Sequence, residues 1–458
     1  MIDTILVYAF LIFILFVGIY KGRKIQSMKE FAIGQKNYAT PVMAATIFAT
    51  LIGGASTIGM TEKAFSIGLV FILASLGKPI GKLILARYIA PQMETFEHMI
   101  TAGDMMEHFY GKPAKIITGV LGVLATTGYV GAQIIALSFM SQILMGIPYE
   151  VGLILGTSII IIYAAFGGVQ SITVTSIAQM IALLIAIPLI CIIGFREIGG
   201  YSAFINAIPT DHKSLVVNPQ ISFYHLGLFI FLCIPFLDPS FIERLLMSRD
   251  RKQIVHSMVI NAVALIPFFI AIGIIGLIAL VLYPEIEANM ALPKLINETI
   301  PSGLKGLVVI GIFCAIMSTG DAELNAASVM FVHDIIQPLK KNPLTDTQEL
   351  KLTRTMTIFV GFAAILAAIL YDNIFDLIIQ SFAFWAPTIL IPLIVGILGL
   401  RASPTVFILS VSAGITTFGL WDLLGKTYFN INGLIPGMLA NGAVLCLLTY
   451  HQTHVKKL

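Results

Sequence analysis

The chain contains thirteen apolar runs, each long enough to cross a lipid bilayer as a helix. Backbone polar groups inside a bilayer must be satisfied within the protein, so such runs predict helices. Charged residues make up 11% of the 458 residues, against about 25% in soluble proteins. We therefore predict an all-α integral membrane protein. The runs cover residues 3–20, 40–62, 66–90, 114–143, 148–166, 172–194, 223–246, 254–282, 303–330, 354–372, 375–399, 404–424 and 431–450.

Basic residues are distributed unequally between the segments that connect these runs. If the N-terminus lies outside, nineteen Lys and Arg residues fall in the inner segments or at the adjoining run ends and six in or beside the outer segments, and Lys78 and Lys82 lie within the third run. Positive charge is retained on the cytoplasmic side of a membrane. We therefore expect a protein of the cell inner membrane with its C-terminus in the cytoplasm. Asp3, with no base before the first run, favours a retained helix over a cleaved signal peptide.

The connecting segments are too short to form a soluble domain. The longest cover residues 91–112, 196–222 and 331–353. We expect a single polytopic domain over residues 1–458, with the lipid bilayer and a small solute as partners and no obligate protein partner. The net charge of +3 resides in short loops and does not indicate nucleic-acid binding. A membrane sensor is not expected, because no catalytic or sensory domain follows the last run, and we expect a secondary active transporter rather than an enzyme.

The ninth run carries polar side chains on one helical face. Polar groups inside hydrocarbon are costly, so this face should meet a partner helix, a cavity or an ion. The hydroxyl oxygens of Ser318 and Thr319 suit a small hard cation such as Na⁺. The alternative is that they hydrogen-bond to carbonyl groups of their own or a neighbouring helix. The face consists of Ala315, Ser318, Asp321, Asn325 and Ser328.

Two of the predicted helices carry residues that interrupt a helix. The second contains Gly53 and Gly54 in mid-span, and the seventh contains Pro235 and Pro239, with Asp238 placed to cap the helix that Pro239 begins. Helices 2–6 and 7–11 are two runs of five, each beginning with an interrupted helix. This arrangement is typical of transporters with inverted repeats and a binding site at the breaks. The repeats cover residues 40–194 and 223–399, with helix 1 peripheral and two extra helices over 404–450.

Three stretches resemble motifs of the sodium:solute symporter family, whose fold is similar to that of LeuT-type transporters. They are YAAFGGVQSITVTSIAQ (residues 163–179), LDPSFIERLLMSRDRKQ (237–253) and AIMSTGDAEL (315–324). The resemblance covers nearly the whole chain and implies a Na⁺-coupled symporter with Na⁺ as its coupling ion. It also implies a Na⁺ site between the second and ninth helices. The implied ligands are the carbonyl groups of Ala49, Ile52 and Ala315 and the hydroxyl groups of Ser318 and Thr319.

The chain departs from the family pattern at positions that bear on ion and solute binding. Many members have Asp where this chain has Ser176, and a small or hydroxyl residue where it has Asp321. In relatives with a second Na⁺ site these two positions face each other, so Asp321 with Ser176 and Ser318 is a candidate site for a second cation or a proton. Leu51 stands where family members often have an acid. The solute contacts of proline-transporting members therefore cannot be carried over directly to this chain.

Residues that face the solute should come from the second, third, fourth, seventh and eleventh helices. Lys78 lies in mid-span and favours a carboxylate solute, such as an amino acid or organic acid; the alternative is a pair with Asp321 or Glu323. Lys82, one turn further in, is expected to extend to the inner surface. The candidates are Thr50, Gly53, Gly54, Ser56, Lys78, Tyr129, Gln133, Phe236, Phe384 and Trp385.

Two other functions remain open at this point. A transporter of the same fold could couple to protons through Asp321 and Lys78. An intramembrane aspartyl protease is a more remote alternative, in which Gly320-Asp321 and Tyr371-Asp372 supply the two catalytic acids. The order of these elements is reversed relative to that class, and Asp372 falls in a predicted outer loop.

Overall fold

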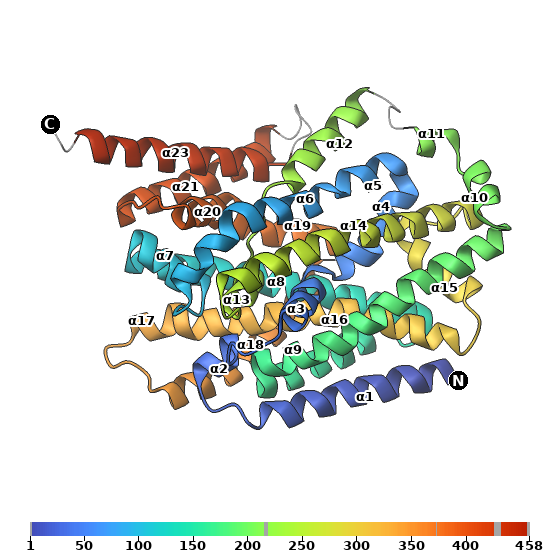
Figure 1. The fold of residues 1–458 in the computed structure, drawn as a ribbon, viewed down its shortest axis with the longest axis horizontal. Coiled ribbons are helices and arrows are strands. Elements are labelled where there is room, and N and C mark those ends of the chain that lie inside the picture. The colour runs from blue at the N-terminus through green and yellow to red at the C-terminus, as the bar shows by residue number, and fades with distance from the viewer. Residues whose placement is uncertain (1, 215–218, 372, 426–431, 456–458) are drawn as a thin grey trace.

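The computed structural model describes all residues except 1, 215–218, 372, 426–431 and 456–458, together with the side chains of 219–224, 425 and 453–455. Every regular element within this described part is a helix (Figure 1). The elements, with α for α-helices and η for 3₁₀ and π turns, are α1 (Ile2–Gly22), α2 (Met28–Ile33), α3 (Thr40–Leu51), η1 (Ala55–Gly59), α4 (Met60–Ile67), α5 (Leu69–Ser75), α6 (Gly77–Ile84), η2 (Leu85–Ile89), η3 (Ala90–Phe96), α7 (Ala102–Tyr110), α8 (Lys112–Met145), α9 (Tyr149–Ile198), α10 (Tyr201–Ala207), α11 (Thr210–Lys213), α12 (Pro219–Leu232), α13 (Pro239–Leu246), α14 (Arg251–Leu282), η4 (Ala288–Met290), α15 (Ala291–Thr299), α16 (Leu304–Met330), η5 (Phe331–Ile336), α17 (Gln337–Leu339), α18 (Asp346–Leu370), α19 (Ile374–Trp385), η6 (Ala386–Leu390), α20 (Ile391–Ile397), α21 (Pro404–Leu420), η7 (Trp421–Gly425) and α23 (Leu434–Val455).

Ten helical segments of the described chain are long and apolar enough to cross a membrane, and α3 with η1 and α4 makes an eleventh. The sequence predicts two more spans. One difference arises because α9 covers two of the predicted spans, and the other because α12 and α13 are short helices that together cover one. The start of α1 and the end of α23 lie at opposite ends of the bundle, as an odd number of crossings requires (Figure 1).

The 50-residue helix α9 bends sharply at Gly168. A straight helix of this length would measure about 75 Å at 1.5 Å per residue, far more than the ~30 Å hydrocarbon core. Gly168 has φ 45° and ψ −157°, which are not helical values. A Cβ atom there would lie 2.6 Å from Cδ2 and 2.7 Å from the carbonyl oxygen of Phe31. Only glycine therefore fits both the backbone conformation and the close approach of α2.

The predicted break in the second helix is present, with a bend of 70° between α3 and the helix that begins at Ala55. Ile52 has extended backbone angles, and the N–H of Gly54 donates a hydrogen bond of 2.8 Å to Oε1 of Gln133 on α8. A Cβ atom on Gly53 would lie 2.7 Å from Gln133 Oε1 and 2.9 Å from Thr319 Oγ1. The glycine pair therefore lets α8 and α16 approach the broken backbone closely.

The predicted break in the seventh helix lies between the end of α12 at Leu232 and the start of α13 at Pro239. Asp238 caps α13 as predicted, because its side chain accepts a hydrogen bond of 2.7 Å from the N–H of Phe241. Nε1 of Trp385 donates a hydrogen bond of 2.7 Å to the carbonyl oxygen of Leu237. The broken backbone thus finds partners inside the protein, as a membrane interior demands.

Helix α16 lies in the centre of the bundle, and nearly all its residues are buried. It packs against α8 and α9 (Figure 1). At its start, Oδ1 of Asp3 accepts hydrogen bonds from the N–H groups of Gly303 (2.8 Å) and Gly306 (2.6 Å), so α1 caps α16. The polar face identified in the sequence is therefore surrounded by protein rather than by lipid.

Candidate functional site

The break of the second helix contacts the polar face of α16 directly. Ser318 Oγ lies 2.9 Å from the carbonyl oxygen of Ala49 and 3.1 Å from that of Ala315. Thr319 Oγ1 lies 3.2 Å from the carbonyl oxygen of Thr50 and 3.4 Å from that of Ala315. All five residues are buried. Two hydroxyl oxygens and three carbonyl oxygens thus converge between the broken helix and α16.

Four of the five expected Na⁺ ligands are brought together here. Ile52, the fifth, is buried directly after α3, and no hydrogen bond in the described part of the chain joins it to Ser318 or Thr319. Gln133 is adjacent: its Oε1 accepts the hydrogen bond from Gly54, and its buried Nε2 has no hydrogen-bond partner among the residues that the structure describes. Ser56 donates a hydrogen bond of 3.3 Å to the carbonyl oxygen of Leu51.

Asp321 is completely buried one turn along α16 from Ser318. Its Oδ2 accepts a hydrogen bond of 2.7 Å from the hydroxyl of Tyr163 on α9, a partner that the sequence analysis did not identify. Its Oδ1 has no hydrogen-bond partner among the described residues, and neither does Oγ of the buried Ser176. A buried carboxylate oxygen and a buried hydroxyl thus remain available on the two helices named in the sequence analysis.

Arg244 is a buried cation that the sequence analysis did not place in the site. Its side chain is 1% exposed, and its Nε donates a hydrogen bond of 3.3 Å to Thr50 Oγ1. Thr50 Oγ1 in turn donates to the carbonyl oxygen of Thr46. Beside it, Oε2 of Glu243 accepts a hydrogen bond of 3.2 Å from Asn325 Nδ2 on the α16 face. Helix α13 therefore makes polar contacts with both α3 and α16 beside the site.

Aromatic rings cover the break of the seventh helix. Phe382 stacks on Tyr129 with ring centroids 5.6 Å apart and contacts Phe236 at 4.9 Å. Trp385 is 1% exposed and bonds to the broken segment through its indole nitrogen. Phe384 is half-buried and joins none of these ring contacts in the described part of the chain. Of the solute-facing candidates, Tyr129 and Phe236 are therefore grouped around Phe382 rather than Phe384, and Trp385 joins the same break through its hydrogen bond to Leu237.

The two lysines of the third predicted helix face aromatic rings. Lys78 Nζ lies 5.3 Å from the ring centre of Phe269, and Lys82 Nζ lies 3.7 Å from that of Phe241. No ion pair within 4.0 Å joins Lys78 to Asp321 or Glu323 in the described structure. Lys82 is 8% exposed and packs against α13, so the expectation that it extends to the inner surface is wrong.

A hydroxyl links two acids beside the break of the seventh helix. Ser240 Oγ lies 2.8 Å from Asp238 Oδ1 and 2.8 Å from Glu323 Oε1. Ser240 and Glu323 are buried, with 1% and 4% of their surfaces exposed. This chain of contacts joins α13 to α16.

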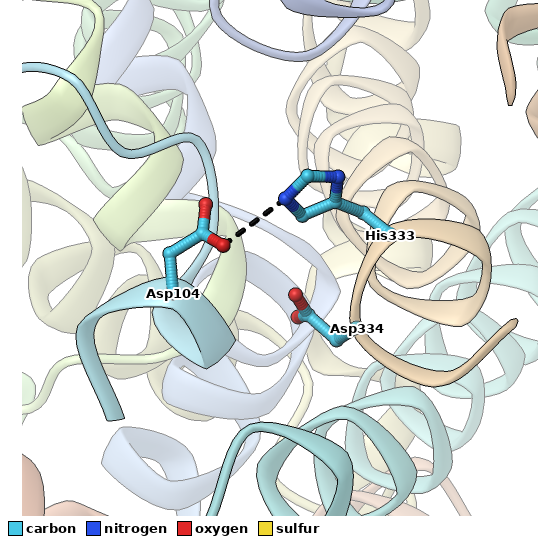
Figure 2. A group of neighbouring side chains, drawn as sticks. All are labelled: Asp104, His333 and Asp334. Atoms are coloured by element: carbon cyan, nitrogen blue, oxygen red, sulfur yellow. Dashed lines mark hydrogen bonds and ion pairs between the residues drawn. The ribbon is translucent and has the colours of Figure 1, made fainter. Parts of the chain in front are cut away.

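A second cluster of charges lies near the end of the bundle that carries α7 and α17 (Figure 1). His333 Nε2 lies 3.0 Å from Asp104 Oδ1, its Nδ1 lies 2.7 Å from Glu349 Oε1, and the Asp334 carboxylate points toward the gap between Asp104 and His333 (Figure 2). Asp104, His333 and Asp334 have the donor types and proximity of a metal site. However, Lys115 Nζ lies 2.6 Å from Asp104 Oδ1. Lys115 and His333 supply positive charge themselves, so the group is an ion-pair network joining α7, α8, η5 and α18.

The contacts of Asp104 in this network lower its pKa. Burial by itself raises the pKa of Asp104, but the hydrogen bond from His333 and the ammonium of Lys115 outweigh burial and hold the pKa well below its usual range. Asp104 also receives a hydrogen bond of 3.0 Å on Oδ2 from the N–H of Ile100. The carboxylate therefore remains ionised and fixes α7 against its neighbours.

Comparison with known proteins identifies the architecture. The family model described as "Sodium:solute symporter family" matches residues 31–405. The chain is 21% identical over 466 residues to the osmoregulated proline transporter of Bacillus subtilis, covering 96% of this chain and 93% of that protein. It is 23% identical over 451 residues to the sodium/pantothenate symporter of Escherichia coli, covering 94% and 92%.

Solved structures show the same fold. A Na⁺-coupled sialic acid symporter, solved in a substrate-bound outward-open state, superposes with a TM-score of 0.81 over 98% of both chains, at 20% sequence identity. A nucleobase-cation-symport-1 family transporter in a closed conformation superposes with a TM-score of 0.56 over 92% of this chain and 95% of that chain, at 12% identity. The overall arrangement of helices is thus that of a secondary transporter.

Proposed function

This chain belongs to the sodium:solute symporter family, and we propose that it imports a small organic solute together with Na⁺ by alternating access. The family and its relatives are secondary transporters rather than enzymes, which removes the aspartyl protease alternative. Of the two acids in that alternative, Asp372 lies outside the described residues, and Asp321 is bonded to Tyr163. The observation that carries the proposal is the convergence of Ser318 and Thr319 on the broken backbone of α3.

The proposed Na⁺ site consists of the carbonyl groups of Ala49, Ile52 and Ala315 and the hydroxyl groups of Ser318 and Thr319. Hard cations prefer oxygen ligands, and a hydroxyl that donates to a carbonyl can rotate so that both oxygens face a cation. The short Ser318–Ala49 contact therefore supports a site that needs little rearrangement to bind Na⁺. The break at Gly53 and Gly54 supplies the free carbonyl groups.

Asp321 is proposed to bind a second cation or a proton close to the first ion, together with Ser176 and Ser318. The support is a completely buried carboxylate and a buried hydroxyl at Ser176; one oxygen of the carboxylate and the hydroxyl have no hydrogen-bond partner in the described part of the chain. A buried carboxylate is costly in the membrane interior; Arg244 is near enough for its charge to act on Asp321, and a bound cation or proton would lower the cost further. Proton coupling through Asp321 is thus the alternative to a second Na⁺.

The topology proposed is thirteen membrane helices with two inverted repeats over residues 40–194 and 223–399. Three observations support it: the bend of α9 at Gly168, the break between α12 and α13, and the opposite positions of the α1 start and the α23 end (Figure 1). The excess of basic residues in the predicted inner segments supports the proposal that the N-terminus lies outside and the C-terminus in the cytoplasm, in the inner membrane of the cell.

The solute is proposed to bind between the two helix breaks. Phe236 lies in the break of the seventh helix, with Tyr129 of α8 and Trp385 of α19 close to the same segment. Thr50, Gly53, Gly54 and Ser56 lie at the break of the second helix, beside Gln133. Lys78 is the candidate partner for a solute carboxylate, as in an amino acid or organic acid. Phe384 is a further candidate at the half-buried end of α19.

Uptake by vesicles reconstituted with the purified protein tests the proposed function. The solutes to compare are labelled proline, pantothenate and sialic acid, which relatives transport, plus a set of other amino acids and organic acids, each under inward Na⁺, K⁺ and H⁺ gradients. The proposal predicts concentrative uptake of at least one solute that an inward Na⁺ gradient drives and a K⁺ gradient does not. Concentrative uptake driven equally well by a proton gradient without Na⁺ would contradict Na⁺ coupling.

A further inference from the structure

Two lysines of α6 lie one turn apart on the same face of the helix. Lys78 and Lys82 are four positions apart, a spacing that makes side chains neighbours on a helix surface. Both belong to the membrane-crossing segment Leu69–Phe96, and Lys82 is 8% exposed. The charge of Lys78 acts on Lys82, and like charges at this spacing destabilise a helix. The fold therefore keeps two ammonium groups together inside the membrane at a cost in stability.

Neither ammonium group has an acid in contact with it. Lys78 Nζ faces the Phe269 ring and Lys82 Nζ faces the Phe241 ring. In the described part of the chain, neither Nζ donates a hydrogen bond or forms an ion pair within 4.0 Å. Asp238 is the one acid there whose charge acts on Lys82, and none acts on Lys78. Two positive charges therefore face one negative charge, which leaves one positive charge without a counter-charge.

The two lysines lie beside the break of the seventh helix. A Cβ atom on Gly81 would lie 2.9 Å from the carbonyl oxygen of Leu232 and 3.2 Å from that of Cys233, so α6 packs directly against the end of α12. On the other side of the break, Lys82 lies over the ring of Phe241 in the first turn of α13. The lysine face thus adjoins the break at which the solute is proposed to bind.

A bound anion would offset the cost of these two charges. An ammonium group without a counter-charge is costly inside a membrane, and contact with an aromatic ring offsets only part of that cost. A carboxylate has two oxygens with about four acceptor positions, so a single carboxylate can accept hydrogen bonds from both lysines. Asp238 does not fill this role, because it caps α13, where its Oδ1 accepts hydrogen bonds from Ser240 and from the N–H of Phe241.

We propose that Lys78 and Lys82 together bind the carboxylate of the solute, and that the solute is an organic anion rather than a zwitterionic amino acid. A singly charged anion neutralises the surplus positive charge, whereas a zwitterion has no net charge and does not. The ammonium group of an amino acid would also lie close to two like charges. The inference rests on the proposed function for the place of the solute and adds to it the role of Lys82 and the class of solute.

Thermal unfolding of the purified protein in detergent tests the proposal. A ligand that binds the folded protein raises its unfolding temperature. The first probes are propionate, propionamide and alanine, which share a carbon skeleton; pantothenate and its neutral alcohol form a second pair. At equal Na⁺ concentration, at least one of the two acids should raise the unfolding temperature, and propionamide, alanine and the alcohol should have much smaller effects. No rise with either acid, or an equal rise with propionate and alanine, would overturn the proposal.

Variants of the two lysines test their roles separately. Lys78→Gln and Lys82→Gln should each weaken the binding of the acids about ten- to a hundredfold and leave the neutral probes unaffected. Lys82→Arg keeps the charge and should retain acid binding. The matched control is Lys63→Gln, because Lys63 also lies over an aromatic ring, that of Phe375, but its side chain is 40% exposed and paired with Glu62. An undiminished preference for acids in Lys82→Gln would overturn the paired site. If a glutamine variant folds poorly, the wild-type comparison of acid, amide and amino acid still decides.

Uptake by reconstituted vesicles separates this inference from the proposed function. Na⁺-driven uptake of zwitterionic or neutral solutes only would retain the proposed function and overturn the anion site. Binding of acids that depends on both lysines, without Na⁺-driven uptake of any solute, would support the anion site and contradict Na⁺ coupling.

Discussion

Ser318 Oγ lies 2.9 Å from the carbonyl oxygen of Ala49, although the two residues are 269 positions apart in the sequence. The contact joins the centre of α16 to the last turn of α3 before its break. Both partners are buried, so no water competes for the carbonyl oxygen. This contact places a hydroxyl and a free carbonyl together inside the membrane, which is the chemical basis of the proposed Na⁺ site.

Asp321 should be essential for ion coupling, whereas Tyr163 should only modify it. We expect Asp321→Ala to abolish coupled uptake, because it removes the buried carboxylate that would face a cation. Tyr163→Phe removes one hydrogen bond to Oδ2 and keeps the charge, so uptake should continue with an altered cation dependence. The measurement is Na⁺-driven uptake and ion stoichiometry in reconstituted vesicles.

Exchanging the residues at positions 176 and 321 tests whether the site needs its carboxylate at position 321 or only somewhere in the cavity. The double variant Ser176→Asp with Asp321→Ser keeps one carboxylate and one hydroxyl in the cavity and should recover coupled uptake. Normal uptake by Asp321→Ala, with Na⁺ and pH dependence unchanged, would instead assign the carboxylate a structural role.

Gly168→Ala should destabilise the protein more than Gly146→Ala does. Both glycines have positive φ, 45° and 68°. Gly146 lies in the left-handed helical region, which costs other residues about 1–2 kcal/mol, whereas ψ −157° puts Gly168 close to a region that is open almost only to glycine. A Cβ atom at Gly146 meets nothing within 4 Å, whereas one at Gly168 lies 2.6 Å from a ring atom of Phe31. Thermal unfolding in detergent measures the difference. Equal losses of stability in the two variants would show that the contact with α2 does not fix the bend of α9.

Gln133 should support the break of the second helix through its side-chain oxygen. Gln133→Glu keeps an acceptor for the N–H of Gly54, whereas Gln133→Leu leaves that N–H buried and unpaired. The unpaired group should cost about 1–3 kcal/mol of unfolding free energy, and the Glu variant should lose less at a pH where its buried carboxyl group is protonated. Unfolding temperatures of the two variants decide the matter, and a Leu variant as stable as the wild type would contradict this role.

Asp104 should contribute to stability in a pH-dependent way. Its pKa is lowered in the folded protein, so its contribution is complete above the pKa of an unfolded Asp, about 3.9, and is lost as the pH falls below that value. The difference in unfolding temperature between wild type and Asp104→Asn should therefore be constant from pH 7 to about pH 5 and narrow below about pH 4. Glu107→Gln, which removes a more exposed partner of Lys115, should show a smaller difference. A difference in unfolding temperature between wild type and Asp104→Asn that grows as the pH falls would contradict the lowered pKa.

The helix breaks could be predicted because their causes are local. Adjacent glycines at 53 and 54, and Asp238 followed by Pro239, determine backbone conformation within a few residues. The polar face of α16 could be predicted for a similar reason, since its residues repeat with the helical period. The family motifs then linked these two local signals to one site.

The partners of the buried polar groups could not be predicted in the same way. Tyr163 and Asp321 are 158 positions apart, and Asp104 and His333 are 229 apart. A single tyrosine or histidine in an apolar helix carries no periodic signal that names its partner. Lys82 was misplaced for a related reason: its distance from the membrane surface could be estimated, but the Phe241 ring packed beside it could not.

The binding of radioactive Na⁺ to the purified protein tests the central claim most directly, because it requires no knowledge of the solute. Ser318→Ala and Thr319→Ala each remove one oxygen from the proposed site, while the control Ser410→Ala removes a buried hydroxyl that bonds to Phe407 on α21. A contact with a charged group is worth about 1.5–3 kcal/mol, so each site variant should bind Na⁺ about ten- to a hundredfold more weakly. The control should bind like the wild type. Wild-type Na⁺ affinity in both Ser318→Ala and Thr319→Ala would contradict the account.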